Sequence, residues 1–152
     1  MKVYICAKYA KTKVYTAIAF VNIKGVIERV ECICNNKTST KYIGYMHGML
    51  KALSLIDKGI VVADTFDFIC DSDDMIRWFE GSKDLKDVPK QHRAMFSDVL
   101  LMCEHSPSVI NIIRAKGLNY ARKYASEKYY NETTSTQIEG VSAVDFFSSI
   151  GV

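Results

Sequence analysis

The sequence predicts one α/β domain built on a five-stranded mixed sheet with helices on its faces. Three observations lead to this fold class. Three strand-like segments follow one another at the start of the 152-residue chain, a helical pattern then separates them from a fourth strand, and the stretch FDFICDSDDMIRW joins that strand to a second helix. The expected order is strand, strand, strand, helix, strand, helix, helix, strand, helix.

The first three strands are expected at residues 2–9, 13–23 and 26–34. Apolar and polar residues nearly alternate in the first and third, and the second is rich in β-branched and aromatic residues. Lys24-Gly25 is a hairpin signal between the second and third. Tight turns between consecutive strands indicate an antiparallel meander.

A first helix is expected from Thr38-Ser39-Thr40, which offer N-cap oxygens, to residue 56. Its core-facing stripe consists of Ile43, Met46, Met49, Leu50, Leu53 and Ile56. Gly44 and Gly48 inside it either permit close packing against the sheet or are simply tolerated. A helix followed by a strand at residues 60–70 is a crossover, so the fourth strand should run parallel to the first.

The stretch Phe66 to Trp78 contains a strand end and a helix start. Asp71 and Ser72 are candidate N-cap residues, and Asp73 and Asp74 place negative charge in the first helical turn, where the helix dipole favours it. A carboxylate at the carboxyl end of a strand is a common place for chemistry, and equally for a cap. Capping statistics favour the cap.

The rest of the chain predicts a helix at residues 92–104, a fifth strand at 109–115 parallel to the fourth, and a last helix from 118 to about 130. Residues 131–140 are polar. The segment VSAVDFFSSI at residues 141–150 is a short apolar patch that could dock on the domain or on a protein partner. We therefore expect a domain over residues 1–131 and a C-terminal tail over 132–152.

The net charge of +3 conceals a strong asymmetry along the chain. Residues 1–51 carry nine Lys and Arg against two acids, residues 52–104 six against eleven, residues 105–131 five against one, and the remainder three acids and no base. If the fold brings the two basic segments together, one face becomes an anion-binding surface. The alternative is that these charges only solvate strand edges and helix backs.

Composition excludes several classes of protein. No apolar run approaches the roughly 20 residues that span a bilayer, and no signal-peptide pattern follows Met1-Lys2, so we expect a soluble, intracellular, cytoplasmic protein without membrane contact. The five cysteines are odd in number and lie mostly in apolar patterns, which indicates buried reduced thiols. Scattered cysteines and histidines give weak support for a zinc site.

The order of elements and several local motifs resemble the ribonuclease H family over about residues 1–130. Ile69-Cys70-Asp71-Ser72 followed by Met75-Ile76 resembles the family's fourth strand and the Asp-Ser pair that begins its next helix. Residues 109–125, with Lys116-Gly117 and then ARKYA, resemble its last strand, glycine turn and final helix.

The resemblance implies hydrolysis of RNA in RNA/DNA hybrids by two metal ions held on four carboxylates. Only Asp71 survives of those four. The other positions fall on Cys6 or Ala7, near Tyr42 to Tyr45, and on Arg122, while Leu118 replaces a histidine of the turn. One carboxylate cannot hold two magnesium ions, so we expect no cofactor, no metal and no catalytic residue, with Asp71 as a vestige, and we predict that the chain is not an enzyme.

Cations replace the missing acids in this alignment and suggest a nucleic-acid surface. Lys and Arg neutralise phosphates without a cofactor, and exposed tyrosines stack on unpaired bases. The predicted nucleic-acid-binding residues are Lys8, Lys11, Lys13, Arg114, Lys116, Arg122, Lys123, Tyr9 and Tyr120. For the tyrosines packing is the competing role, and for Arg122 an ion pair with Asp71 competes equally with phosphate binding.

The sequence therefore predicts a non-catalytic nucleic-acid-binding protein with a ribonuclease H-like fold, preferring single-stranded or structured RNA or RNA/DNA hybrid, and compatible with a viral or phage origin. Two alternatives stay open. One is an active nuclease that uses a rearranged set of acids, Asp67, Asp71, Asp73 and Asp74. The other is a protein-interaction module whose contact is the tail patch or the Met-rich first helix.

Overall fold

The computed structural model describes residues 1–10, 13–35, 40–81, 85–117 and 119–130. The predicted site residue Lys11, the position of Leu118 and the predicted tail at 132–152 lie outside them. The strands are β1 (Lys2–Ala10), β2 (Lys13–Val21), β3 (Ile27–Asn35), β4 (Thr65–Cys70) and β5 (Val109–Arg114). The helices are α1 (Lys41–Asp57), α2 (Asp73–Glu80), a short 3-10 turn η1 (Lys90–His92), α3 (Arg93–Glu104) and α4 (Tyr120–Tyr130).

The strands form one mixed sheet in the order β3-β2-β1-β4-β5. β1 pairs antiparallel with β2, and β2 with β3, whereas β1–β4 and β4–β5 are parallel. This arrangement confirms the predicted fold class of a three-stranded meander plus two parallel strands. It arises because hairpins join the first three strands, while α1 carries the chain across the sheet to β4.

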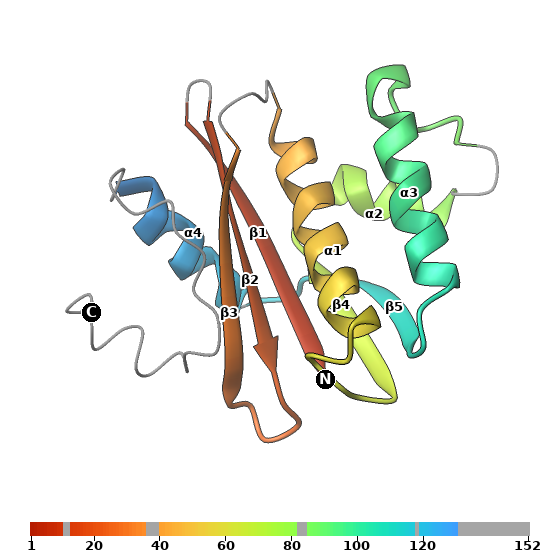
Figure 1. The fold of residues 1–152 in the computed structure, drawn as a ribbon. Coiled ribbons are helices and arrows are strands. Elements are labelled where there is room, and N and C mark those ends of the chain that lie inside the picture. The colour runs from red at the N-terminus through yellow and green to blue at the C-terminus, as the bar shows by residue number, and fades with distance from the viewer. Residues whose placement is uncertain (11–12, 36–39, 82–84, 118, 131–152) are drawn as a thin grey trace.

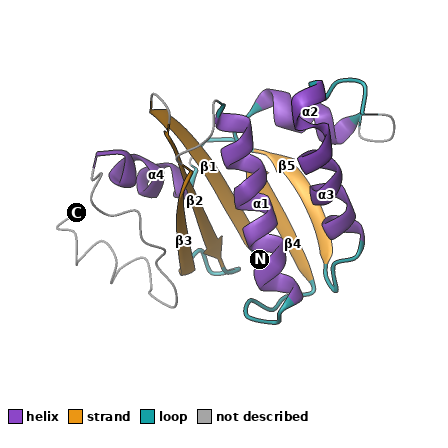
Figure 2. Ribbon diagram, turned by 45° about the horizontal axis from the view of Figure 1, so that its top comes forward, coloured by secondary structure: helices purple, strands orange, loops and turns teal. Residues whose placement is uncertain are grey.

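The helices cover the two faces of the sheet unequally (Figure 1). α1 packs on β1 and β2, and α3 packs on α1 with α2 beside β5 and β4, so all three occupy one face. α4 lies on the other face against β1 and β2 (Figure 2). Because adjacent side chains of a strand point to opposite faces, each face has its own core.

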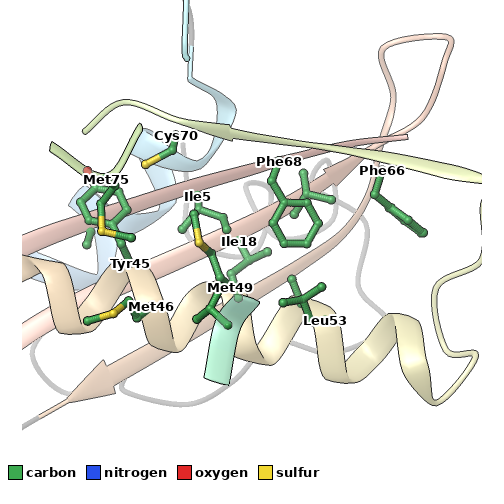
Figure 3. Close-up of a cluster of buried hydrophobic side chains, with 14 of the residues drawn as sticks. Ile5, Ile18, Tyr45, Met46, Met49, Leu53, Phe66, Phe68, Cys70 and Met75 are labelled. Carbon is green, nitrogen blue, oxygen red and sulfur yellow. The ribbon is translucent and has the colours of Figure 1, made fainter. Parts of the chain in front are cut away.

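The larger core lies between the sheet and α1 (Figure 3). Ile5 and Phe68 from the sheet are fully buried beneath Met46 and Met49 of the helix. Larger rings close the end near α2 and α3, where Trp78 packs edge-on to Phe96. The smaller core, under α4, is built around Tyr124 and Ala121.

Two glycines allow α1 to lie close to the sheet. A Cβ at Gly44 would lie 2.3 Å from Val14 Cγ1 and 2.8 Å from Thr16 Oγ1, and one at Gly48 would lie 2.9 Å from Thr16 Cγ2. Real Cβ atoms do not approach neighbours so closely, so a side chain at either position would push the helix outward. Close packing, and not tolerance, therefore explains both glycines.

The structure corrects two element boundaries and one cap. β4 begins at Thr65 and not at residue 60, because residues 58–64 form a turn and an irregular connection after α1. α4 begins at Tyr120. Ser72 alone caps α2, accepting a hydrogen bond from the Met75 amide, whereas Asp71 makes other contacts that are described below. No helix in the described ranges is long and apolar enough to cross a membrane.

The close contacts around Gly44 predict that replacing this helix glycine by alanine lowers the stability of the protein. Gly44→Ala in an exposed helix would raise stability by about 1 kcal/mol through helix propensity. Here we expect it to lower the free energy of unfolding by about 1–3 kcal/mol, because the methyl group overpacks the interface with Val14 and Thr16. Chemical denaturation measures the difference, with Ser54→Ala on the same helix as the control, and a more stable Gly44→Ala protein would contradict the packing.

Candidate functional site

Asp71 lies at the carboxyl end of β4, next to the end of β5 and the middle of β1, which both run parallel to β4. It directly follows β4, whose last residue, Cys70, pairs with Ile5 of β1 on one side and with Arg114 of β5 on the other. The carboxyl ends of parallel strands form one edge of the sheet, which is where α/β proteins commonly place binding groups. The side chain of Asp71 is only 15% exposed.

Three side chains donate hydrogen bonds to the Asp71 carboxylate. The Tyr45 hydroxyl of α1 donates to Oδ1 at 2.5 Å. On the other oxygen, Oδ2, the Asn119 amide donates at 3.3 Å and the Arg122 guanidinium at 3.0 Å. Both oxygens therefore accept hydrogen bonds. Of the two roles that the sequence allows for Arg122, the ion pair with Asp71 is present in the structure.

Asn119 joins the start of α4 to the sheet. Its Nδ2 also donates to the Ile5 carbonyl of β1 at 3.2 Å, and its Oδ1 accepts from the Ala121 amide at 2.9 Å. The second bond is an N-cap, in which a side chain satisfies one of the free amides at a helix start. Asn119 is 4% exposed, so one buried amide fixes strand, helix and Asp71 together.

The pKa values of the ionisable groups around Asp71 are shifted in the directions that keep these hydrogen bonds formed. Burial, followed by the hydrogen bond to Asp71, raises the pKa of Tyr45, so its hydroxyl stays protonated as a donor. Burial, and then the Asp71 charge, raises the pKa of Cys6 to about 11, so this thiol is neutral at physiological pH. The hydrogen bond that Arg122 donates to Asp71 raises the pKa of Arg122, which stays charged.

The other acids of this region are also held by partners. Asp73 forms an ion pair with Arg114 at 2.9 Å, and Asp74 binds Arg77 at 3.1 Å as well as the Tyr42 hydroxyl. Asp67 lies four residues before Asp71, which is roughly 13 Å along an extended chain. Its Oδ1 accepts from the Asn111 amide at 3.0 Å.

These residues do not fit the two metal ions that the fold family implies. Such ions need several shared carboxylate oxygens. In the part of the chain that is described, no three His, Cys, Asp or Glu side chains gather closely enough to hold a metal ion. At Asp71 itself, a guanidinium and an amide contact the oxygen that a metal would need.

Five of the predicted cations lie around this edge of the sheet. Arg122 and Arg114 are 64% and 52% exposed beyond their ion pairs. Lys116 in the β5–α4 connection and Lys123 of α4 are exposed. Lys8 is half-buried on β1, and its charge, like those of Asp71 and Arg122, acts on the Cys6 thiol. We refer to Lys8, Arg114, Lys116, Arg122 and Lys123 as the cationic edge.

The remaining predicted residues lie elsewhere or make other contacts. Lys13 begins β2, and its charge acts on Cys34 at the end of β3. Tyr9 is 47% exposed, but its position in β1 places it on the opposite face from Lys8. Tyr120 packs edge-on against Tyr4, with ring centroids 4.8 Å apart.

Tyr45 and Asn119 were not predicted as site residues. Tyr45 lies four and eight residues before Met49 and Leu53 of the apolar stripe of α1, so its spacing is that of a core residue. Asn119 precedes ARKYA and has an N-cap residue type, which is the one local signal that could have identified it. Its contact with Asp71 is 48 residues distant in sequence and leaves no local pattern.

Comparison with known proteins identifies the fold. The chain matches LC11-RNase H1, solved in complex with an RNA/DNA hybrid, with a TM-score of 0.73 and 12% identity over 88% of this chain and 99% of that one. It matches RNase H1 of the halophilic archaeon Halobacterium salinarum NRC-1 with a TM-score of 0.68 and 13% identity, over 86% and 97%. The N-terminal RNase H domain of rv2228c from Mycobacterium tuberculosis gives 0.67 and 11%, over 88% and 97%.

These identities establish the fold and nothing narrower. No family model and no curated protein sequence matches the chain. The predicted resemblance to the ribonuclease H family is confirmed at the level of the fold. The prediction that the chain is not an enzyme is wrong as an inference from the lost carboxylates. Its structural neighbours are RNase H1 enzymes, and neither the fold nor these comparisons show inactivity.

The hydrogen bonds around Asp71 predict an order of stability losses. Asn119→Ala removes the cap of α4, the donor to the Ile5 carbonyl and one of the three donors to Asp71, so we expect a loss of about 2 kcal/mol or more. Arg122→Ala removes an exposed ion pair and should cost less than about 1 kcal/mol. Urea denaturation of both variants checks the order, and a larger loss for Arg122→Ala would contradict it.

Proposed function

We propose that this protein binds nucleic acid through the cationic edge and prefers ligands that contain RNA. The observation that carries the proposal is the state of Arg122. One nitrogen of its guanidinium donates a hydrogen bond to the Asp71 carboxylate, and the Arg122 side chain remains 64% exposed. A guanidinium fixed in this way keeps further N–H donors for a phosphate at little additional cost in side-chain entropy.

The charges around Arg122 support phosphate binding. The cationic edge contributes five positive charges, and Asp71 and Asp73 contribute two negative ones, so the surface stays positive after its ion pairs are counted. Lys and Arg attract a phosphate backbone through release of its counterions, and this attraction needs no base contact. We therefore expect binding that does not depend on the base sequence of the nucleic acid and that weakens strongly as the salt concentration rises.

The preference for RNA rests on the fold. One structural neighbour, LC11-RNase H1, was solved in complex with an RNA/DNA hybrid. The wide minor groove of A-form helices presents 2′-hydroxyls that a protein edge can contact. A protein partner at residues 141–150 also remains a proposal, and that segment lies outside the described residues.

The proposal predicts how charge reversals act on binding. In titrations with single-stranded RNA, duplex RNA, RNA/DNA hybrid and DNA, we expect the double variant Lys116→Glu/Arg122→Glu to weaken binding at least about tenfold and to lower the salt slope. Lys24→Glu/Lys58→Glu makes the same change in net charge at two exposed positions in other turns. This control should retain binding to within about threefold.

Two outcomes would overturn the proposal. Equal losses in both variants would show that net charge alone acts, and absence of binding at low salt would favour the protein-interaction module.

Hydrolysis is measured on the same labelled hybrid with Mg²⁺ and Mn²⁺, since the structural neighbours are RNase H1 enzymes. Cleavage that is lost in Asp71→Asn would assign activity to the rearranged acids.

A further inference from the structure

The strand β5 ends the sheet with an unprotected edge. It is last in the strand order, and within the described residues no strand pairs with its outer side. On the side that faces β4, the backbone amides of Val109 and Ala115 donate hydrogen bonds to the Asp64 and Cys70 carbonyls. Since alternate residues of a strand direct their backbone groups to opposite sides, the N–H and C=O groups of Ile110 and Ile112 point outward.

The opposite edge of the same sheet is protected in the ways that natural proteins use. β3 carries Glu28 and Arg29, has the fully buried charge of Glu31, and its pairing with β2 is interrupted by a register shift. Charges, inward-pointing acids and bulges all hinder edge-to-edge pairing. Residues 109–113 of β5 contain no charge, no proline and no register shift against β4.

The exposed side chains of β5 are apolar on both faces. Val109 is 60% exposed and Ile113 40% exposed on the face that α4 leaves uncovered. On the other face, half-buried Ile110 and Ile112 line a pocket of about 280 Å³ with Phe79 of α2 and Leu100 of α3. An edge of this kind is suited to pairing with another apolar strand.

We propose that β5 pairs with β5 of a second copy of this chain, antiparallel and centred on Asn111. The sequence VINII is nearly the same read in both directions about its asparagine, as a twofold interface requires. In this register Val109 lies opposite Ile113 of the partner, and Ile110 lies opposite the partner's Ile112. The two outward-facing residues then form a hydrogen-bonded pair on each side of the axis.

Charge complementarity favours the same register. Arg114 is the one cation of β5, and antiparallel pairing places it opposite Ser108 of the partner and not opposite another arginine. Ser108 follows shortly after the carboxyl end of α3, where Glu104 and the last helix carbonyls carry negative charge. Centring on Ile112 would set Arg114 against Ile110 and Ile113 against Asn111, so polar and apolar residues would mismatch.

Self-association is measured by sedimentation velocity on the full chain. We expect the apparent mass to rise with concentration from 17.2 kDa towards twice that value. Val109→Lys/Ile113→Lys sets like charges against each other at both ends of the pairing and should weaken the dimer at least about tenfold. Val109→Lys/Ile113→Glu sets opposite charges there and should restore it. Circular dichroism confirms that each variant is folded.

The register has its own test. Asn111→Cys places two thiols across the axis at a non-hydrogen-bonded pair, where Cα atoms are about 4.5 Å apart and a disulfide can form. Mild oxidation should cross-link this variant, but not the natural protein or Ile23→Cys, which is 99% exposed in the β2–β3 turn. A monomer at every concentration, or equal cross-linking of Ile23→Cys, would overturn the proposal.

Discussion

The hydrogen bonds of the Asp71 carboxylate connect both layers of helices to the end of the sheet. Tyr45 reaches it from α1, while Asn119, just before α4, and Arg122 within α4 reach it from the opposite face. A carboxylate that is 15% exposed needs such donors, because an unpaired charge there would carry a large desolvation cost. The position of α4, and with it that of the exposed cations Arg122 and Lys123, therefore depends on Asp71.

This arrangement changes what chemistry the strand ends can carry. The family's metal site needs carboxylate oxygens that are open to an ion, whereas here the oxygens of Asp71 accept hydrogen bonds from neutral and cationic side chains. The outward part of the site is then a surface of guanidinium and ammonium groups. Our proposal of nucleic-acid binding rests on this surface, because Lys and Arg side chains neutralise phosphates without a metal ion.

Most of the fold was predictable from the sequence, but the centre of the site was not. Hairpin signals predicted the antiparallel meander, and the α1 stripe followed by the strand of the 66–78 junction predicted a parallel fourth strand, because each depends on neighbours in the chain. Arg122 was correctly placed opposite Asp71 only through the family resemblance. Tyr45 and Asn119 were missed, and Asp71 was assigned a cap that Ser72 makes, since contacts across 26 to 48 residues leave no local pattern.

Mapping the bound nucleic acid residue by residue tests the central claim most directly. In heteronuclear NMR spectra of the labelled chain titrated with an RNA/DNA hybrid, backbone amide shifts should change most for Arg114, Lys116, Arg122 and Lys123, and Arg122 side-chain signals should move. The same spectra should leave β3 unchanged, because it lies at the far edge of the sheet from β5. Largest changes on β3 or in the β2–β3 turn, with the cationic edge unaffected, would contradict the account.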